Sequence, residues 1–185
     1  MYSIKKIIQI DRGILEKIIP GYSSSTIFEV SAESSDSGTC FTLAPKKLDK
    51  TYSKNHDYSD PSTLAHYNGV ILQGLSFGAF INEELVGVIL GEVLDWNSTV
   101  AVREFGVSPE VQGQGIGRSL LEHVLTQPQC KKLRGVICET QATNVPAIRF
   151  YEKMGFVIQG LDLSLYTNDD LRSGEVAIFL RKSLG

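Results

Sequence analysis

Three glycines, Gly113, Gly115 and Gly117, stand where a β-rich run gives way to a helical pattern. Residues 99–107 read as the strand, and the apolar residues between positions 116 and 125 recur at the spacing of a helix packed on a sheet. Glycines leave backbone N–H groups uncovered, and a helix N-terminus adds unpaired N–H groups and the positive end of its dipole. The stretch therefore predicts an anion site, with a pyrophosphate as the best-fitting ligand.

Three other interpretations of these glycines exist. A Walker loop needs Lys and then Ser or Thr after its last glycine, whereas Arg118 and Ser119 follow Gly117 here. A dinucleotide-binding loop would use Glu139, about twenty residues on, for a ribose, but its fingerprint requires glycine at position 118. A glycine-rich turn without a ligand stays open.

Two motifs together indicate a family. Gln112-x-x-Gly115-x-Gly117 resembles the acetyl-CoA signature of the GNAT N-acetyltransferases, which is Gln or Arg, two residues, Gly, one residue, then Gly or Ala. Asn144, Ala147, Phe150-Tyr151 and Gly155-Phe156 resemble the later motif of the same family, about thirty residues downstream. The chain is therefore similar to an acetyl-CoA-dependent N-acetyltransferase, with acetyl-CoA as co-substrate and no metal.

The resemblance implies a set of acetyl-CoA contacts. Backbone groups at positions 105 and 107 would hold the pantetheine arm, and N–H groups of residues 112–118 would hold the pyrophosphate. The implied contacts are Phe105, Gly106, Val107, Gln112, Gly113, Gln114, Gly115, Ile116, Gly117, Arg118, Asn144, Ala147 and Tyr151. Two alternatives stay open: Arg118 is a solvated arginine, and Asn144 is a simple N-cap.

The reaction needs a base and an acid, because an alkylammonium must lose a proton before it attacks a thioester and the thiolate must gain one. The resemblance assigns the base to Glu104, directly or through water, and the acid to Tyr151. An N–H near Phe105 would stabilise the oxyanion. Glu104 alternatively pairs with Arg103 or only positions the substrate, and Tyr151 is alternatively a core aromatic.

The acceptor is expected to be a primary amine of a small molecule. The C-terminal region, including residues 138–141, 165–168 and 175–179, resembles the streptothricin acetyltransferases, which modify the β-lysine arm of a cationic antibiotic. Candidate carboxylates for such a cation are Glu92, Asp95, Glu139 and Asp162. One departure is that the family's usual acid pair before the loop is Arg103-Glu104 here. Alternatives are acetylation of a protein amine or a polyamine, and a CoA-binding sensor without turnover.

Composition narrows the class of protein. A net charge of -3 gives no bulk attraction to nucleic acid. No apolar run approaches the ~20 residues of a membrane span, and the N-terminus lacks a signal peptide's apolar stretch. The three cysteines form no C-x-x-C pair and the three histidines share no metal-ligand spacing, so we expect a cytoplasmic protein without a metal.

The predicted elements form one α/β (α+β) domain over residues 1–185, with an acetyl-CoA-binding core at about 75–182 and a GNAT fold. A mixed, mostly antiparallel twisted sheet surrounds a central parallel β-α-β unit, with flanking helices. Strands are predicted at 26–32, 40–43, 77–81, 85–94, 99–107, 133–139, 156–161 and 175–180. Helices are predicted as short pieces before Pro20, then at 61–73, from 116, and from 144 to 153. Family members often dimerise, so a homodimer is an open expectation.

Overall fold

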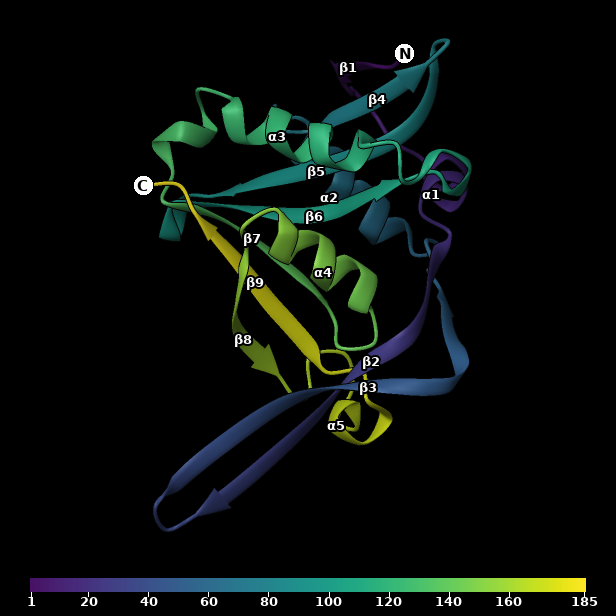
Figure 1. The fold of residues 1–185 in the computed structure, drawn as a ribbon. Helices are drawn as coiled ribbons and strands as arrows, with labels where there is room; N and C mark the ends of the chain where they lie inside the picture. Colours follow the sequence, from purple (N-terminus) through teal and green to yellow (C-terminus); the bar gives the residue numbers. More distant parts are fainter. The chain divides into compact units, whose positions relative to one another are not determined.

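The computed structural model describes residues 1–185, which form two compact units (Figure 1). The first unit contains residues 1–21, 55–138 and 182–185, and the second contains residues 22–54 and 139–181. Strands β7 (Gly135–Gln141) and β9 (Ala177–Ser183) each cross from one unit to the other. None of the helices combines the length and the apolar composition that crossing a bilayer requires.

The first unit is built around an antiparallel meander. Its elements are β1 (Ser3–Lys6), α1 (Arg12–Ile18), α2 (Pro61–Ile71), β4 (Phe77–Ile81), β5 (Glu84–Leu94), β6 (Thr99–Val107) and α3 (Ile116–Thr126), with 3-10 turns at Asp95–Asn97, Pro109–Val111 and Cys130–Lys132. Strands β4, β5 and β6 follow the predicted bounds to within one residue. Asp60 is the N-cap of α2, and its side chain accepts a hydrogen bond from Ser62 N–H.

The second unit contains β2 (Gly21–Ser35), β3 (Gly38–Asn55), α4 (Val145–Lys153), β8 (Val157–Asp162) and α5 (Asp170–Ser173). Strands β8 and β9 pair antiparallel, as predicted for the C-terminal pair. Gly155 has a φ of 83°, the left-handed conformation expected after the end of α4.

The strands hydrogen-bond in the order β1-β4-β5-β6-β7-β9-β8, and β2 and β3 form a separate two-stranded ribbon. The β6–β7 pair is parallel, while β1–β4, β4–β5, β5–β6 and β8–β9 are antiparallel. A mixed sheet with one central parallel pair and flanking helices confirms the predicted fold class.

Two local predictions were wrong, and one helix was not predicted. Residues 3–6 form a strand rather than a helical piece, because they pair with the edge of β4. The hairpin strands β2 and β3 are far longer than the predicted segments, and all residues from 31 to 42 are exposed, so no apolar alternation marks them. The segment between the last two predicted strands contains a short helix, α5, for which no helix was predicted.

Candidate active site

The loop between β6 and α3 presents its backbone to solvent. Residues 112–115 are all exposed, and Gly113 and Gly115 have φ values of 77° and 81°. A side chain at either position would be strained by that conformation, although nothing lies within 4 Å of where its Cβ would be. The glycines are therefore required by the path of the chain and leave the loop surface open.

The first turn of α3 has no side-chain cap. Gly115 occupies the N-cap position and cannot supply an oxygen to the N–H groups that follow. The helix is fixed by its apolar face, since Ile116, Leu120, Leu121 and Val124 are buried. Burial of each such side chain contributes roughly 1.5–3 kcal/mol. A rigid helix with an uncapped, exposed N-terminus is what binding of a pyrophosphate requires.

The side chains of Gln112 and Arg118, at the two ends of the loop, form hydrogen bonds within the protein. Gln112 Nε2 donates to the Val107 carbonyl at 2.9 Å, which closes the loop onto the end of β6. Arg118 Nε donates to Glu122 one turn along α3 at 2.8 Å, and its side chain is 70% exposed. Arg118 is thus exposed, as the solvated alternative expected, and a contact of its side chain with a phosphate remains a prediction.

Strand β6 changes its hydrogen-bonding environment along its length. It pairs with β5 over its whole extent, from Leu94↔Thr99 to Gly87↔Val107. Parallel pairing with β7 covers only the first four residues and ends at Val102↔Cys138. Gly106 packs against the end of α1, because a Cβ there would come within 2.5 Å of Ile19 Cγ1. Close packing therefore explains Gly106 without a ligand.

A β-bulge separates Arg103 from Glu104. Leu90 lies opposite Glu104 and Gly91 lies opposite Val102, so Arg103 is the extra residue on β6. Arg103 Nε forms a hydrogen-bonded ion pair with Glu92 on β5. The alternative in which Arg103 pairs with Glu104 is therefore wrong, and its positive charge is neutralised on the other strand.

Glu104 accepts three hydrogen bonds. Its Oε2 accepts from the Tyr58 and Tyr67 hydroxyls at 3.2 and 3.1 Å, and its Oε1 accepts from Phe105 N–H at 3.2 Å. Burial raises the pKa of Glu104 above its ordinary value, against the opposing effect of these hydrogen bonds. A carboxylate with a raised pKa and no cationic partner is suited to accept a proton. The Phe105 N–H predicted for the oxyanion is directed at Glu104.

In the second unit, Asn144 caps α4. Its Oδ1 accepts from Ala147 N–H at 3.2 Å, and Pro146 occupies the first turn. The N-cap role of Asn144 is therefore confirmed, and the Ala147 N–H is used by that cap. Any contact of either residue with acetyl-CoA remains a prediction.

Tyr151 is buried on α4. Its ring lies 5.2 Å from the Phe156 ring and 5.5 Å from the Phe150 ring, between centroids. The ring therefore fills the core of the second unit, as the alternative interpretation expected. A core position of the ring is compatible with a functional hydroxyl, so the role of Tyr151 as the acid remains a prediction.

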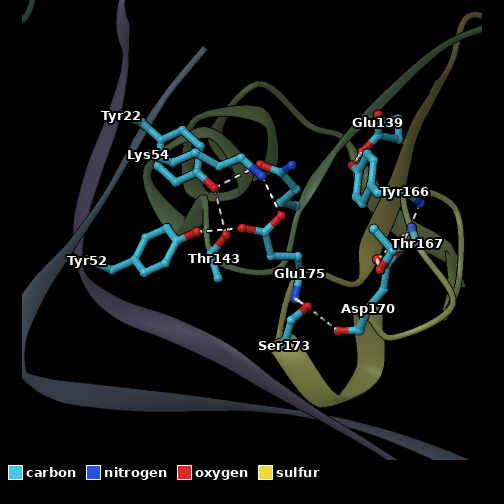
Figure 2. A network of polar contacts seen from close by, with 11 residues as sticks. Tyr22, Tyr52, Lys54, Glu139, Thr143, Tyr166, Thr167, Asp170, Ser173 and Glu175 are labelled. Atoms are coloured by element: carbon cyan, nitrogen blue, oxygen red, sulfur yellow. Dashed lines mark hydrogen bonds and ion pairs between the residues drawn. The ribbon is translucent and has the colours of Figure 1, made fainter. Parts of the chain in front are cut away.

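A polar cluster lies at the base of the β2–β3 hairpin (Figure 2). Glu175 accepts from the Tyr52 hydroxyl at 2.7 Å and forms an ion pair with Lys54. The Tyr22 hydroxyl contacts the Thr143 hydroxyl at 2.6 Å. These contacts tie both hairpin strands to the segments that enter β9 and α4, so the cluster stabilises the second unit.

The four carboxylates predicted to bind substrate have different surroundings. Glu92 is neutralised by Arg103, and Asp162 Oδ1 accepts from Ser164 N–H at 2.9 Å in the turn after β8. Asp95 precedes β6, about 30 Å along that strand from the glycine loop at the usual rise per residue. Glu139 accepts a hydrogen bond from the Tyr166 hydroxyl. Burial raises the pKa of Glu139, although that hydrogen bond and Lys54 oppose the shift.

The sequence patterns did not reveal the tyrosines that surround the carboxylates. Tyr58 and Tyr67 lie 46 and 37 residues before Glu104, and no motif connects them to it. Tyr67 lies on α2, a helix that was predicted, so a helical projection could have suggested that it faces the sheet. No group of three or more His, Cys, Asp or Glu side chains is arranged to hold a metal ion.

Comparison with known proteins places this geometry in a family. Residues 44–156 match the model described as the acetyltransferase (GNAT) family. A streptothricin acetyltransferase of Escherichia coli is 38% identical over 104 residues, which cover 56% of this chain and 59% of that protein. The chain thus spans less than two thirds of that relative.

Solved structures resemble the whole chain. A nourseothricin acetyltransferase superposes with a TM-score of 0.73 and 26% identity, covering 100% of this chain and 99% of that one. A protein of Bacillus anthracis str. Ames in complex with acetyl coenzyme A gives a TM-score of 0.71 at 22% identity, covering 100% and 98%, which shows the shared fold. The protein belongs to the GNAT family of acetyltransferases.

Proposed function

We propose that this protein transfers an acetyl group from acetyl-CoA to a primary amine of a small molecule, with streptothricin as the first candidate acceptor. The observation that carries the proposal is the exposed, uncapped N-terminus of α3, which directly follows the strand bearing Glu104. The relatives named for streptothricin and nourseothricin acetylation support the choice of acceptor.

In the proposed reaction, the first unit binds the thioester carrier and prepares the amine. Backbone N–H groups of residues 113–118 bind the pyrophosphate, and backbone groups at Phe105 and Val107 hold the pantetheine arm. Glu104 removes a proton from the acceptor ammonium, directly or through a water. The neutral nitrogen then attacks the thioester carbonyl, forming the C–N bond as the C–S bond breaks.

The resemblance to the family carries the remaining roles in this proposal. Tyr151 protonates the departing thiolate, since a phenol of pKa ~10 can protonate a thiolate of pKa ~8.5, and it regains a proton through water as the new amide nitrogen loses its second proton. Among the four predicted carboxylates, Glu139 is retained as the contact for a cationic acceptor. Glu92 is already neutralised, Asp95 lies far along β6 from the loop, and Asp162 accepts a hydrogen bond from a backbone N–H in the turn after β8. The acetylated nitrogen is no longer basic, so the product loses the charge that favoured its binding.

The glycine loop offers a matched test. Gly115 and Gly174 have φ values of 81° and 80°, and a Cβ at either position meets nothing within 4 Å. Alanine should therefore cost each position the same strain, about 1–2 kcal/mol. By calorimetry, Gly115→Ala should weaken acetyl-CoA binding by about tenfold or more, whereas Gly174→Ala should leave it unchanged. Equal affinities in the two variants would remove the loop as the binding site.

Turnover identifies the acceptor. CoA release would be measured with streptothricin, polyamines and aminoglycosides at fixed acetyl-CoA. We expect turnover with streptothricin. Turnover only with polyamines or a protein amine would reassign the acceptor, and acetyl-CoA binding without turnover on any amine would indicate a sensor.

A further inference from the structure

Tyr58 is the centre of a hydrogen-bonded chain that joins Glu104 to His56. The Tyr58 oxygen lies 3.2 Å from Glu104 Oε2, 3.2 Å from His56 Nδ1 and 3.3 Å from the Ile19 carbonyl oxygen. Tyr58 is buried, whereas His56 is half-buried. The chain therefore runs from a carboxylate inside the first unit to a base that reaches its surface.

The Tyr58 hydroxyl carries one proton, so it can donate to only one of these three acceptors at a time. A tyrosine hydroxyl donates one hydrogen bond and accepts up to two. With Glu104 ionised, the Tyr58 hydroxyl donates to the carboxylate and accepts from the Nδ1–H of His56. With Glu104 protonated, the carboxyl donates to Tyr58, and the Tyr58 hydroxyl turns to the Ile19 carbonyl or to an unprotonated His56 Nδ1. Both protonation states of Glu104 are thus accommodated without an unsatisfied hydroxyl.

Tyr67 also contacts Glu104 but is not part of the connection to His56. Tyr67 donates to the same Oε2 at 3.1 Å, so it stabilises the carboxylate as Tyr58 does. The contacts that connect Glu104 to His56 pass through Tyr58. The two tyrosines can therefore be compared. The Tyr58 hydroxyl lies in the middle of the hydrogen-bonded chain, and the Tyr67 hydroxyl contacts the Glu104 end of it.

We propose that Tyr58 and His56 form a proton relay that carries the proton collected by Glu104 away from the acceptor. This inference rests on the proposed role of Glu104 as the base. The Glu104 O–H bond breaks as an O–H bond forms at Tyr58, while the Tyr58 O–H bond breaks as an N–H bond forms at His56 Nδ1. One proton moves in total, and Glu104 becomes a carboxylate again. The imidazolium of His56, whose Nδ1–H then donates to Tyr58, releases one proton to water and returns to the tautomer that is protonated at Nε2.

The phenol never has to ionise in this relay. Burial raises the pKa of Tyr58 above its ordinary value, with the charge of Glu104 acting in the same direction. Tyr58 must therefore gain a proton as it gives one up. Regeneration of Glu104 prepares the enzyme for the next ammonium, so the relay acts through Glu104 and touches no substrate.

The first test needs no substrate and follows the histidine side chains by nitrogen NMR during a pH titration of the free protein. Besides His56, the titratable groups in the cluster are Glu104, Tyr58 and Tyr67. In the wild type, the His56 signals should show a second inflection when Glu104 titrates, because the two groups are coupled. Tyr58→Phe should abolish this inflection and Tyr67→Phe should retain it. A retained inflection in Tyr58→Phe, or none in the wild type, would overturn the relay.

The second test measures turnover. His56→Gln keeps a side chain that can hydrogen-bond to Tyr58 but cannot accept the proton, so kcat should fall about tenfold. Added imidazole should restore the rate of this variant and leave the wild type unaffected, a rescue that a purely structural role would not give. His66→Gln, on the exposed face of α2, is the matched control and should behave as the wild type.

The outcomes separate the two proposals. If the wild type acetylates no amine, the proposed function fails while the NMR titration still decides whether the hydrogen-bonded chain conducts a proton. If Glu104→Gln acetylates at the wild-type rate, the base is elsewhere and the relay has no role in turnover. If His56→Gln is slow but insensitive to imidazole, or is as fast as the wild type, the relay is wrong even though the enzyme is an acetyltransferase.

Discussion

Glu104 in the first unit and Glu175 in the second are half-buried glutamates that each accept a hydrogen bond from a tyrosine hydroxyl. Their remaining partners differ, since Glu104 has a second hydroxyl and a backbone N–H while Glu175 has the ammonium of Lys54. Burial raises the pKa of Glu104, and its hydrogen bonds do not overcome that effect. Burial acts in the same direction on Glu175, but Lys54 and Tyr52 outweigh it and lower the pKa.

The difference shows how one residue type is given two different proton affinities. A carboxylate surrounded by hydroxyls is held in place while keeping a high affinity for protons, which suits a base. A carboxylate paired with a lysine stays charged and serves as a structural cross-link. The presence of the cation, rather than the presence of tyrosine, separates the two cases.

The largest expected effect on activity is that of replacing Glu104, the proposed base. Glu104→Gln keeps the size of the side chain and one acceptor oxygen for the tyrosine hydroxyls but removes the proton acceptor. We expect kcat/KM to fall by about 10²–10⁴, with acetyl-CoA affinity retained. Glu16→Gln, which breaks an exposed ion pair with Arg12, is the control. An unchanged rate would make Glu104 a structural carboxylate like Glu175.

A second test asks whether the Tyr151 hydroxyl takes part in the reaction. Tyr151→Phe removes one hydroxyl from a buried ring and should lower kcat by about 10–10² if that hydroxyl protonates the thiolate. Acetyl-CoA affinity, measured by calorimetry, should stay the same. Tyr2→Phe, which removes the hydroxyl bonded to Ser119, controls for loss of a hydroxyl. A wild-type rate in Tyr151→Phe would leave only a core role for this ring.

The pH dependence of stability should have opposite signs for the two glutamates. A raised pKa in the folded state means that the unfolded chain releases the Glu104 proton first, so stability falls as pH rises above about 4.5 towards the folded pKa. Urea unfolding at several pH values should therefore show Glu104→Gln gaining stability relative to the wild type as pH rises. A constant difference would contradict the raised pKa.

The smallest effect is expected for Lys54. The lowered pKa of Glu175 contributes stability above its unfolded value, which is lost as pH falls below about 4.5 through the folded pKa. Lys54→Met should cost about 1 kcal/mol near pH 7, and the cost should shrink at lower pH. Lys46→Met breaks the more exposed pair with Glu29 and should cost less. Equal costs for the two lysines would show that the half-buried pair has no special role.

Local sequence patterns predicted the elements around the glycine loop. The meander of β4, β5 and β6, the apolar face of α3 and the Asn144 cap of α4 all follow from spacings of a few residues. The long β2–β3 hairpin could not be predicted in this way, because its outer half is exposed on both faces and needs no alternation of apolar residues.

The partners of Glu104 were not predictable for a different reason. Tyr58 and Tyr67 reach it from a loop and a helix about forty residues upstream, and single residues at such separations leave no periodic signal. The ion pair of Arg103 with Glu92 depends on a bulge, which a regular strand pattern does not reveal. Residues that act together at the candidate base are thus specified by tertiary packing.

The bulge in β6 makes two consecutive positions independent of each other. Arg103 has no partner residue on β5, and its guanidinium pairs with Glu92. The next side chain, Glu104, accepts hydrogen bonds from tyrosine hydroxyls. Substituting Arg103 can therefore alter the surface charge beside β6 without changing the proton affinity of Glu104. The bulge at Arg103 thus allows the surface charge at this position and the proton affinity of Glu104 to change separately during evolution.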